Sequence, residues 1–119
     1  MLYKVIGLMS GTSLDGLDIA YCYFSFENHK WTYSIEKATT IEYSSQIKDM
    51  LLKAEDTSSE EFAKIDKEFG HFLGKETKEF IDKHNLEVDF ISSHGQTIFH
   101  QPHINLTTQI GDINAIYSH

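Results

Sequence analysis

The chain has 119 residues, which is enough for one domain with a hydrophobic core and too few for two. Hydrophobic residues make up 40% of the sequence and aromatic residues 13%, a composition that excludes an intrinsically disordered protein. The formal net charge of −8 argues against a non-specific nucleic-acid binder, because such proteins neutralise phosphates with Lys and Arg. This charge is compatible with a nucleotide that is held by backbone amides.

The single cysteine and the N-terminal sequence predict a soluble, cytoplasmic protein. Cys22 has no partner for an intrachain disulfide, which favours a reducing compartment. We expect Cys22 to be a small core residue in a strand. The apolar run after Lys4 is too short for a signal sequence or a membrane span, so no membrane partner is expected.

Three strands are predicted in the N-terminal part of the chain. Near-continuous apolar residues over 3–9 predict a strand that is buried on both faces. Alternation of apolar and polar residues predicts a second strand over 17–23 and a third over 31–43, the third with one face in solvent. A turn is predicted at 27–30, so the three strands should form an antiparallel meander.

Helical periodicity follows the third strand. Apolar residues at helical spacing predict a short amphipathic helix over 47–54. Ser58 and Glu61 have the spacing of a capping box, which predicts the start of a longer helix. We expect that helix to end at Asn85 in the left-handed conformation.

Another buried strand is predicted over 88–92, and a polar cluster, SSHGQTIFHQPH, follows it. Asp112 resembles the N-cap of a further helix. The order of predicted strands and helices indicates an α/β fold.

The segment from Gly11 to Asp18, GTSLDGLD, is a polar interruption between two apolar strands. Its glycine spacing matches a Walker A loop, but a Leu–Asp pair stands where that motif needs Lys followed by Ser or Thr. The segment also leads into a predicted strand, whereas a Walker A loop opens a helix. An ordinary turn is a second interpretation, because Gly and Asp are common turn residues.

A phosphate-binding hairpin is a third interpretation, and it explains more of these residues. Glycines let backbone N–H groups approach phosphate oxygens, and the hydroxyls of Thr12 and Ser13 add donors. The Asp15 carboxylate would repel a phosphate, so we expect it to hold Mg²⁺ through water or to orient the loop. On the residues alone, the turn and the phosphate hairpin both stay open.

The polar cluster near the C-terminal end contains His94, His100 and His103. Their spacing is not that of a zinc finger and no cysteine accompanies them, so no metal site is expected. A hairpin with histidines in solvent is one interpretation. Because the cluster follows the strand over 88–92, at the end where open α/β sheets bind ligands, we also expect His94 and Gln96 to contact substrate or a phosphate-bound water.

Two blocks of this sequence resemble those of a known family. IGLMSGTSLDGLD closely resembles the opening of the anhydro-N-acetylmuramic acid kinases, which belong to the sugar kinase, heat-shock chaperone and actin superfamily of ATPases. SSHGQTIFHQP followed by TTQIGD resembles the second block of that family. The resemblance implies a ribonuclease H-like (actin-like ATPase) N-terminal lobe over 1–119, with the meander, helices and further strands in one mixed sheet. A second lobe would lie outside this chain.

The resemblance also implies an activity. Such kinases use ATP and Mg²⁺ to open 1,6-anhydro-N-acetylmuramic acid with water and phosphorylate it, giving N-acetylmuramic acid 6-phosphate in peptidoglycan recycling. By the resemblance, the segment that binds the phosphates of ATP comprises Gly11, Thr12, Ser13, Leu14, Asp15, Gly16, Leu17 and Asp18. Asp18 is expected to be structural. His94 and Gln96 would line the cleft near the transferred phosphate and the sugar.

The general base of the family is expected beyond residue 119, so the chain by itself is expected to be inactive. One alternative is another sugar or acetate-type kinase of the superfamily, although those relatives usually have aspartate where this chain has Ser10. A second alternative is a non-catalytic interaction domain with an ATPase fold. The expected partners are ATP and the anhydro sugar, with no nucleic acid. We also expect the full-length protein to form a homodimer.

Overall fold

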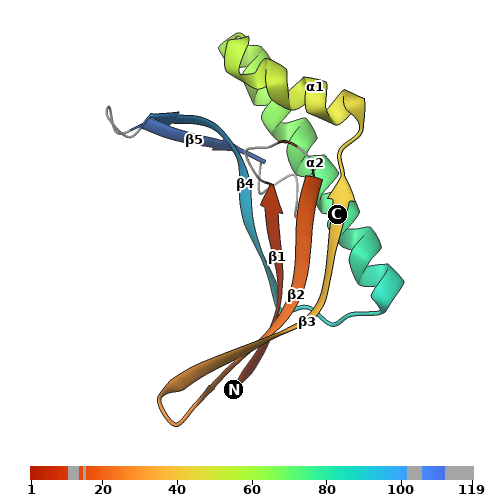
Figure 1. The fold of residues 1–119 in the computed structure, drawn as a ribbon, viewed down its shortest axis with the longest axis vertical. Helices are drawn as coiled ribbons and strands as arrows, with labels where there is room; N and C mark the ends of the chain where they lie inside the picture. Colours follow the sequence, from red (N-terminus) through yellow and green to blue (C-terminus); the bar gives the residue numbers. More distant parts are fainter. Residues whose placement is uncertain (11–13, 15, 102–105, 112–119) are drawn as a thin grey trace.

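The computed structural model describes residues 1–10, 14, 16–101 and 106–111, with side chains except at 55 and 95–110. These residues form an α/β fold (Figure 1). The elements in chain order are β1 (Leu2–Ser10), β2 (Gly16–Glu27), β3 (Lys30–Glu42), α1 (Ser45–Lys53), the 3₁₀ helix η1 (Ala54–Asp56), α2 (Ser59–His84), β4 (Phe90–Gln101) and β5 (Leu106–Ile110).

The strands form one mixed sheet of five, in the order β3-β2-β1-β4-β5. β1 and β2 are antiparallel, as are β2 and β3, which confirms the predicted meander. β4 joins β1 in parallel, and β5 returns antiparallel to β4. The predicted turn lies at Asn28 and His29, whose φ angles of 53° and 61° are those of a tight hairpin turn that matches the strand twist.

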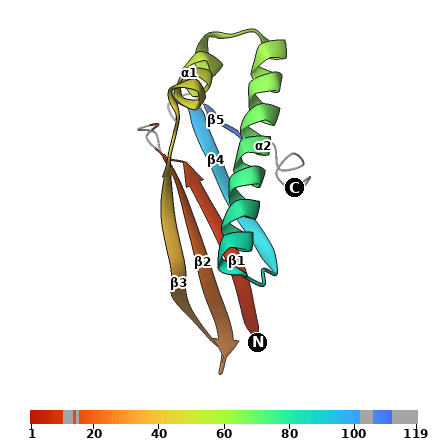
Figure 2. The same cartoon turned by 90° about the vertical axis from the view of Figure 1, so that its right-hand side faces the viewer.

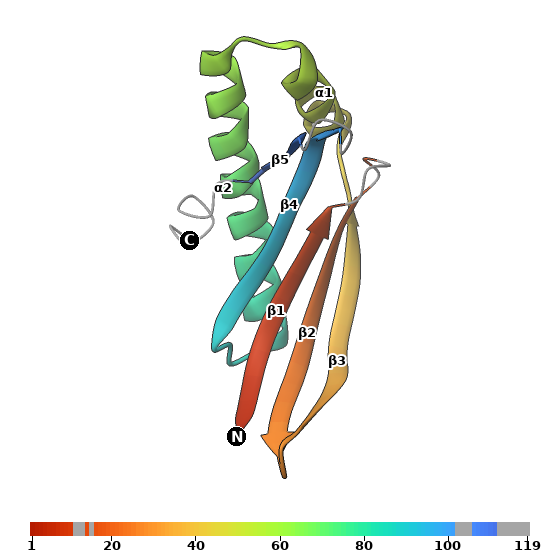
Figure 3. The same cartoon turned by 90° about the vertical axis from the view of Figure 1, so that its left-hand side faces the viewer.

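The helices lie on one face of the sheet. α2 runs along this face, and α1 lies at the end where β1 terminates (Figures 2 and 3). Because side chains alternate between the two faces of a strand, β1 and β2 each send every second residue toward the helices. The buried core formed in this way includes Ile6, Leu8, Leu17, Ile19, Tyr21, Leu51, Ile65, Phe69, Leu73 and Phe80.

The ends of α2 are formed by the residues that the sequence predicted. The Ser58 side chain accepts a hydrogen bond from the backbone N–H of Glu61, with 3.2 Å between the heavy atoms. Asn85 has φ 52° and ψ 54°, the left-handed conformation that ends many helices. Among the described residues, no helix has the length and apolar character to cross a bilayer.

Two predictions about strand burial are wrong. The face of β1 that points away from α2 is partly open, and Met9 on this face is 54% exposed. β3 is exposed on both faces, apart from the half-buried Ile41. The physical reason is that β3 is an edge strand, and that no helix of the described residues covers the second face of the sheet (Figures 2 and 3).

The strand predicted over 88–92 is longer than expected. β4 begins at Phe90 and extends to Gln101, so His94 and Gln96 lie inside the strand and do not follow it. Pairing with β5 keeps the chain extended beyond the end of β1. The polar composition of this stretch did not indicate a strand. Asp112, the predicted helix cap, lies outside the described residues.

Candidate functional site

The carboxyl end of β1 is the point where the two polar segments meet. Ser10, the last residue of β1, pairs with Leu17 of β2 on one side and with Gln96 of β4 on the other. The end of β1 therefore lies beside β4, and β2 begins at Gly16 on the other side of β1. Because ligands of open α/β sheets bind outside the carboxyl ends of strands, this arrangement marks a candidate ligand site.

Gln96 is the position at which β4 changes its pairing. Its backbone lies between Ser10 of β1 and Ile110 of β5, and beyond it β4 pairs with β5. The register between β1 and β4 also shifts between Leu8 and Ser10. Such irregularities are common next to active sites, where they redirect side chains. The Gln96 side chain lies outside the described atoms, so its predicted contact with substrate stays a prediction.

A buried hydrogen bond anchors the end of β1. The Tyr43 hydroxyl donates to the Ser10 Oγ at 2.5 Å, and both side chains are buried. The Tyr43 ring packs edge-on against Phe69 of α2, with 6.2 Å between ring centroids. Ser10 is thereby connected to the helical layer. Sequence reasoning missed this role, although an aromatic residue at the end of the β3 alternation was the available signal.

Two residues of the segment 11–18 place constraints on the backbone near the end of β1. Leu14 has φ 57° and packs half-buried against the core. A left-handed residue is typical of backbone concavities that gather N–H groups toward an anion. At Gly16, a Cβ atom would lie 2.8 Å from the backbone oxygen of Ile41, so a side chain would force β2 and β3 apart.

Leu17 and Asp18 have side chains on opposite faces of β2. Leu17 is fully buried in the core, so only its backbone could contact a ligand. Asp18 is exposed, and its Oδ1 accepts a hydrogen bond of 2.6 Å from the Thr40 hydroxyl of β3. This bond across the hairpin is consistent with the structural role expected for Asp18.

The other predicted site residues are only partly described. His94 is exposed in β4, two residues before Gln96. The predicted phosphate-contacting and metal-orienting residues outside the described part of the chain are Gly11, Thr12, Ser13 and Asp15. Their contacts therefore stay predictions.

Cys22 lies in β2 as expected, but it is only half-buried and does not belong to the buried core, because its side chain is on the sheet face opposite the helices. Burial raises the pKa of its thiol above the usual value, which keeps the thiol protonated. Because the thiolate is the nucleophilic form, this shift disfavours Cys22 as a nucleophile.

Comparison with known proteins adds to this geometry. The family model described as anhydro-N-acetylmuramic acid kinase matches residues 3–119. Three curated proteins of that name come from Actinobacillus pleuropneumoniae serotype 7, Picosynechococcus and Clostridioides difficile, and they are 34%, 35% and 36% identical to this chain. The alignments cover 96%, 95% and 90% of this chain.

The same alignments cover 32%, 31% and 31% of the relatives, so the chain spans about a third of the length of the curated proteins it matches. Two sequence blocks had predicted this family, and the family model includes both of them. The chain belongs to the anhydro-N-acetylmuramic acid kinase family.

Proposed function

We propose that this chain is the phosphate-binding lobe of an ATP-dependent kinase for 1,6-anhydro-N-acetylmuramic acid. The observation that carries the proposal is the pairing of Ser10 with both Leu17 and Gln96. This pairing brings the two blocks typical of the family to one end of the sheet, although they are far apart in the sequence. Relatives that are named for this kinase support the same activity.

Two described residues at this end of the sheet support a site for the phosphates of a nucleotide. Leu14 has a left-handed φ, a conformation that also occurs in anion-binding concavities, and Gly16 lets the two strands approach closely. Because the chain has a net charge of −8, we propose that backbone amides and Mg²⁺, with Asp15 orienting the loop, offset the phosphate charge. Bound ATP would supply the phosphoryl group.

The proposed reaction consumes one water and one ATP for each sugar. The water oxygen bonds to C1 of the sugar while the C1–O6 bond breaks, and O6 accepts the γ-phosphoryl group. The products are N-acetylmuramic acid 6-phosphate and ADP. Backbone amides of 11–16 would hold the phosphates, and His94 and Gln96 would contact the sugar or a phosphate-bound water. The general base that activates the attacking water is proposed to lie outside this chain.

The strand order also supports a more specific fold assignment. An antiparallel meander, with β4 added in parallel beside β1, supports a ribonuclease H-like lobe of the actin-like ATPases. We further propose that this lobe closes on a second lobe, with ATP and the sugar between them. A cytoplasmic location follows from the need for ATP, and the expected homodimer stays a prediction.

The test is a transfer assay on the full-length protein that contains these residues. With ATP, Mg²⁺ and the anhydro sugar, mass spectrometry should detect a product heavier than the sugar by one water and one phosphoryl group. In ¹⁸O-labelled water, the product should carry the heavy oxygen at C1. A product that is heavier than the sugar by a phosphoryl group alone would contradict hydrolytic opening.

A competing acceptor separates the alternatives. N-acetylglucosamine has no anhydro bond, and we expect it to be a much poorer substrate than the anhydro sugar. A preference for N-acetylglucosamine would favour another sugar kinase of the superfamily. No ATP-dependent product with either sugar would favour a non-catalytic interaction domain.

A further inference from the structure

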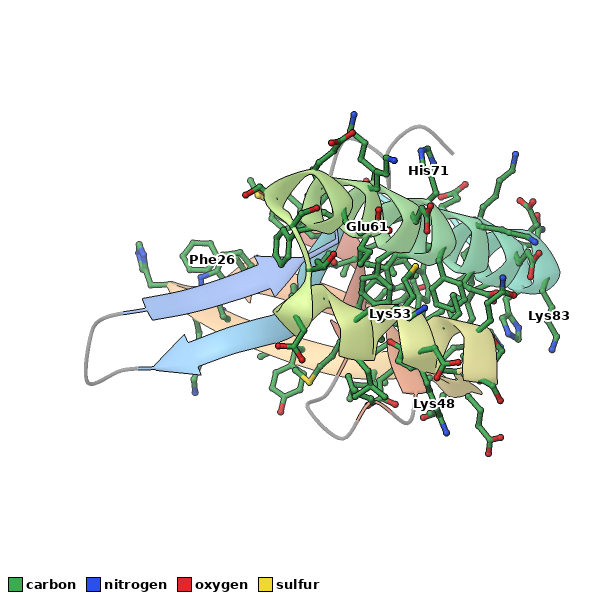
Figure 4. All side chains as sticks on the ribbon, turned by 90° about the horizontal axis from the view of Figure 1, so that it is seen from above. Phe26, Lys48, Lys53, Glu61, His71 and Lys83 are labelled. Carbon is green, nitrogen blue, oxygen red and sulfur yellow. The ribbon has the colours of Figure 1, made fainter. Side chains whose placement is uncertain are left out.

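A side chain of α2 holds the backbone at the end of β5. The Oδ1 of Asp66 accepts a hydrogen bond of 2.7 Å from the backbone N–H of Gly111, and this bond is half-buried. Figure 4 shows β5 running toward the half of α2 that carries Glu61 and His71. A carboxylate that accepts from a backbone N–H makes a charge-assisted bond, which is stronger than a bond between neutral groups.

The backbone of Gly111 needs such a restraint. Its φ is 120°, a conformation that glycine adopts freely and that other residues rarely adopt. Because glycine has more conformational freedom than any other residue, its own backbone does not select this conformation. The hydrogen bond to Asp66 supplies the selection, so the end of β5 is fixed from the helical side of the sheet.

The end of β5 lies beside Gln96 of the candidate site. Ile110, which precedes Gly111, pairs with Gln96, and Gln96 pairs with Ser10 on its other side. Shifts of register occur on both sides of this point, between β1 and β4 before Ser10 and between β4 and β5 after Thr97. Regular pairing around Gln96 is therefore short, and the position of its backbone depends on how firmly both neighbouring strands are held.

One turn of α2 supports both of these neighbours. Asp66 holds β5, which lies on one side of Gln96. Phe69, three residues further along the helix, packs against the ring of Tyr43, whose hydroxyl donates to Ser10 at the end of β1. Residues three apart in a helix are neighbours on its surface. The strand on each side of Gln96 is thus connected to the same helical turn.

We propose that Asp66 is a positioning residue of the kinase, which fixes the end of β5 and, through it, the place of Gln96 in the site. This inference rests on the proposed function. Because a displacement of about 1 Å at a reacting site can lower the rate about a hundredfold, loss of the restraint should slow the reaction. The phosphates of ATP are proposed to bind the backbone of 11–16, between β1 and β2, so ATP binding should not depend on Asp66.

Hydrogen–deuterium exchange in the full-length protein, resolved to single amides, tests the contact. In Asp66→Ala, the Gly111 amide should exchange about tenfold or more faster than in the wild type, because a hydrogen bond to a charged group is lost. Asp66→Asn keeps an acceptor oxygen and should keep most of the protection. Glu68→Ala removes a carboxylate from an exposed position of the same helix and should leave this exchange unchanged. Unchanged exchange in Asp66→Ala would overturn the proposal.

Steady-state kinetics separate positioning from a role in stability alone. Asp66→Ala should lower kcat with the anhydro sugar about ten- to a hundredfold and should leave the KM for ATP within about twofold of the wild-type value. Asp66→Asn should restore most of kcat, and Glu68→Ala should retain wild-type kcat. A role in stability alone would reduce the amount of folded enzyme but leave kcat per folded molecule unchanged, and that result would overturn the proposal.

Combination with Gln96→Ala tests the route of the effect. Because Asp66 is proposed to act through Gln96, the double variant with Asp66→Ala should have a kcat no lower than that of Gln96→Ala alone. Losses that multiply would overturn the proposal. If Asp66→Ala does not fold, Asp66→Glu, whose longer side chain displaces the carboxylate, replaces it in each experiment.

The two kinds of measurement distinguish this inference from the proposed function. A wild-type protein without kinase activity would overturn the proposed function, and with it the effect of Asp66 on turnover. The exchange of the Gly111 amide would still show whether Asp66 holds the end of β5. Normal activity with unchanged exchange in Asp66→Ala would overturn the positioning role alone.

Discussion

The Tyr43 hydroxyl donates a hydrogen bond to the Ser10 Oγ across 33 positions of the sequence. It connects the residue that follows β3 with the last residue of β1, directly before the segment proposed to bind phosphate. The bond is buried between the end of the sheet and the helices, so water does not compete for it. The end of β1 is thereby fixed in position from the helical side.

Tyr43→Phe should lower the free energy of unfolding by about 1 kcal/mol, because it removes this hydrogen bond and keeps the ring that packs against Phe69. Urea denaturation measures the change. Ser10→Ala and the double variant complete a double-mutant cycle, in which the two substitutions should be less costly together than the sum of their separate effects. Strictly additive effects would show that the bond contributes nothing.

Gly16→Ala should destabilise the protein by about 1–3 kcal/mol, because the new Cβ atom meets the backbone of β3 at 2.8 Å. The next nearest atom is the Thr40 Cγ2 at 3.1 Å. Thr40→Ser removes that methyl group but keeps the hydroxyl that bonds Asp18, and it should not rescue Gly16→Ala. Rescue would show that the side chain is the obstacle and would contradict the backbone explanation.

The ionised carboxylate of Glu76 should lower the free energy of unfolding at neutral pH. Burial raises the pKa of its carboxyl above the ordinary value of 4.5, and the negative charge of Glu79 adds to this shift. Because the folded pKa lies above the unfolded one, the favourable contribution of the protonated form is complete below pH 4.5 and is lost as the pH rises through the folded pKa. Glu76→Gln should therefore stabilise the protein at pH 7.

Denaturation of the Glu76→Gln variant at several pH values checks this sign. The gain in stability over the wild type should shrink as the pH falls and disappear below about pH 4, where both forms carry a neutral side chain. Glu68→Gln, at an exposed position of the same helix, is the control and should change stability little at any pH. A gain at Glu76 that persists at low pH would indicate a cause other than charge.

Gln96→Ala should lower the turnover of the full-length kinase at least tenfold, if the residue contacts the sugar or a phosphate-bound water as proposed. Steady-state kinetics with the anhydro sugar measure the effect. Gln46→Ala, at an exposed position of α1, removes the same amide group from a residue outside the proposed set of site residues and should keep wild-type kinetics. Wild-type turnover in Gln96→Ala would remove this residue from the proposed site.

Local patterns in the sequence predicted the local structure well. A near-continuous apolar run predicted β1, alternation predicted β2 and β3, and the predicted turn formed at Asn28 and His29. Ser58 and Asn85 cap the two ends of α2 as expected, because a cap depends on a few neighbouring residues. The two polar blocks also predicted the family from the sequence alone.

Properties that depend on distant residues needed the tertiary structure. The length of β4 is decided by its pairing with β5, and exposure of the second sheet face depends on which elements pack there. The contact between Tyr43 and Ser10, and the position of Ser10 beside Gln96, arise from strand order. Periodicity along a chain records which side of its own element a residue faces, whereas only the packing of elements decides what that side meets.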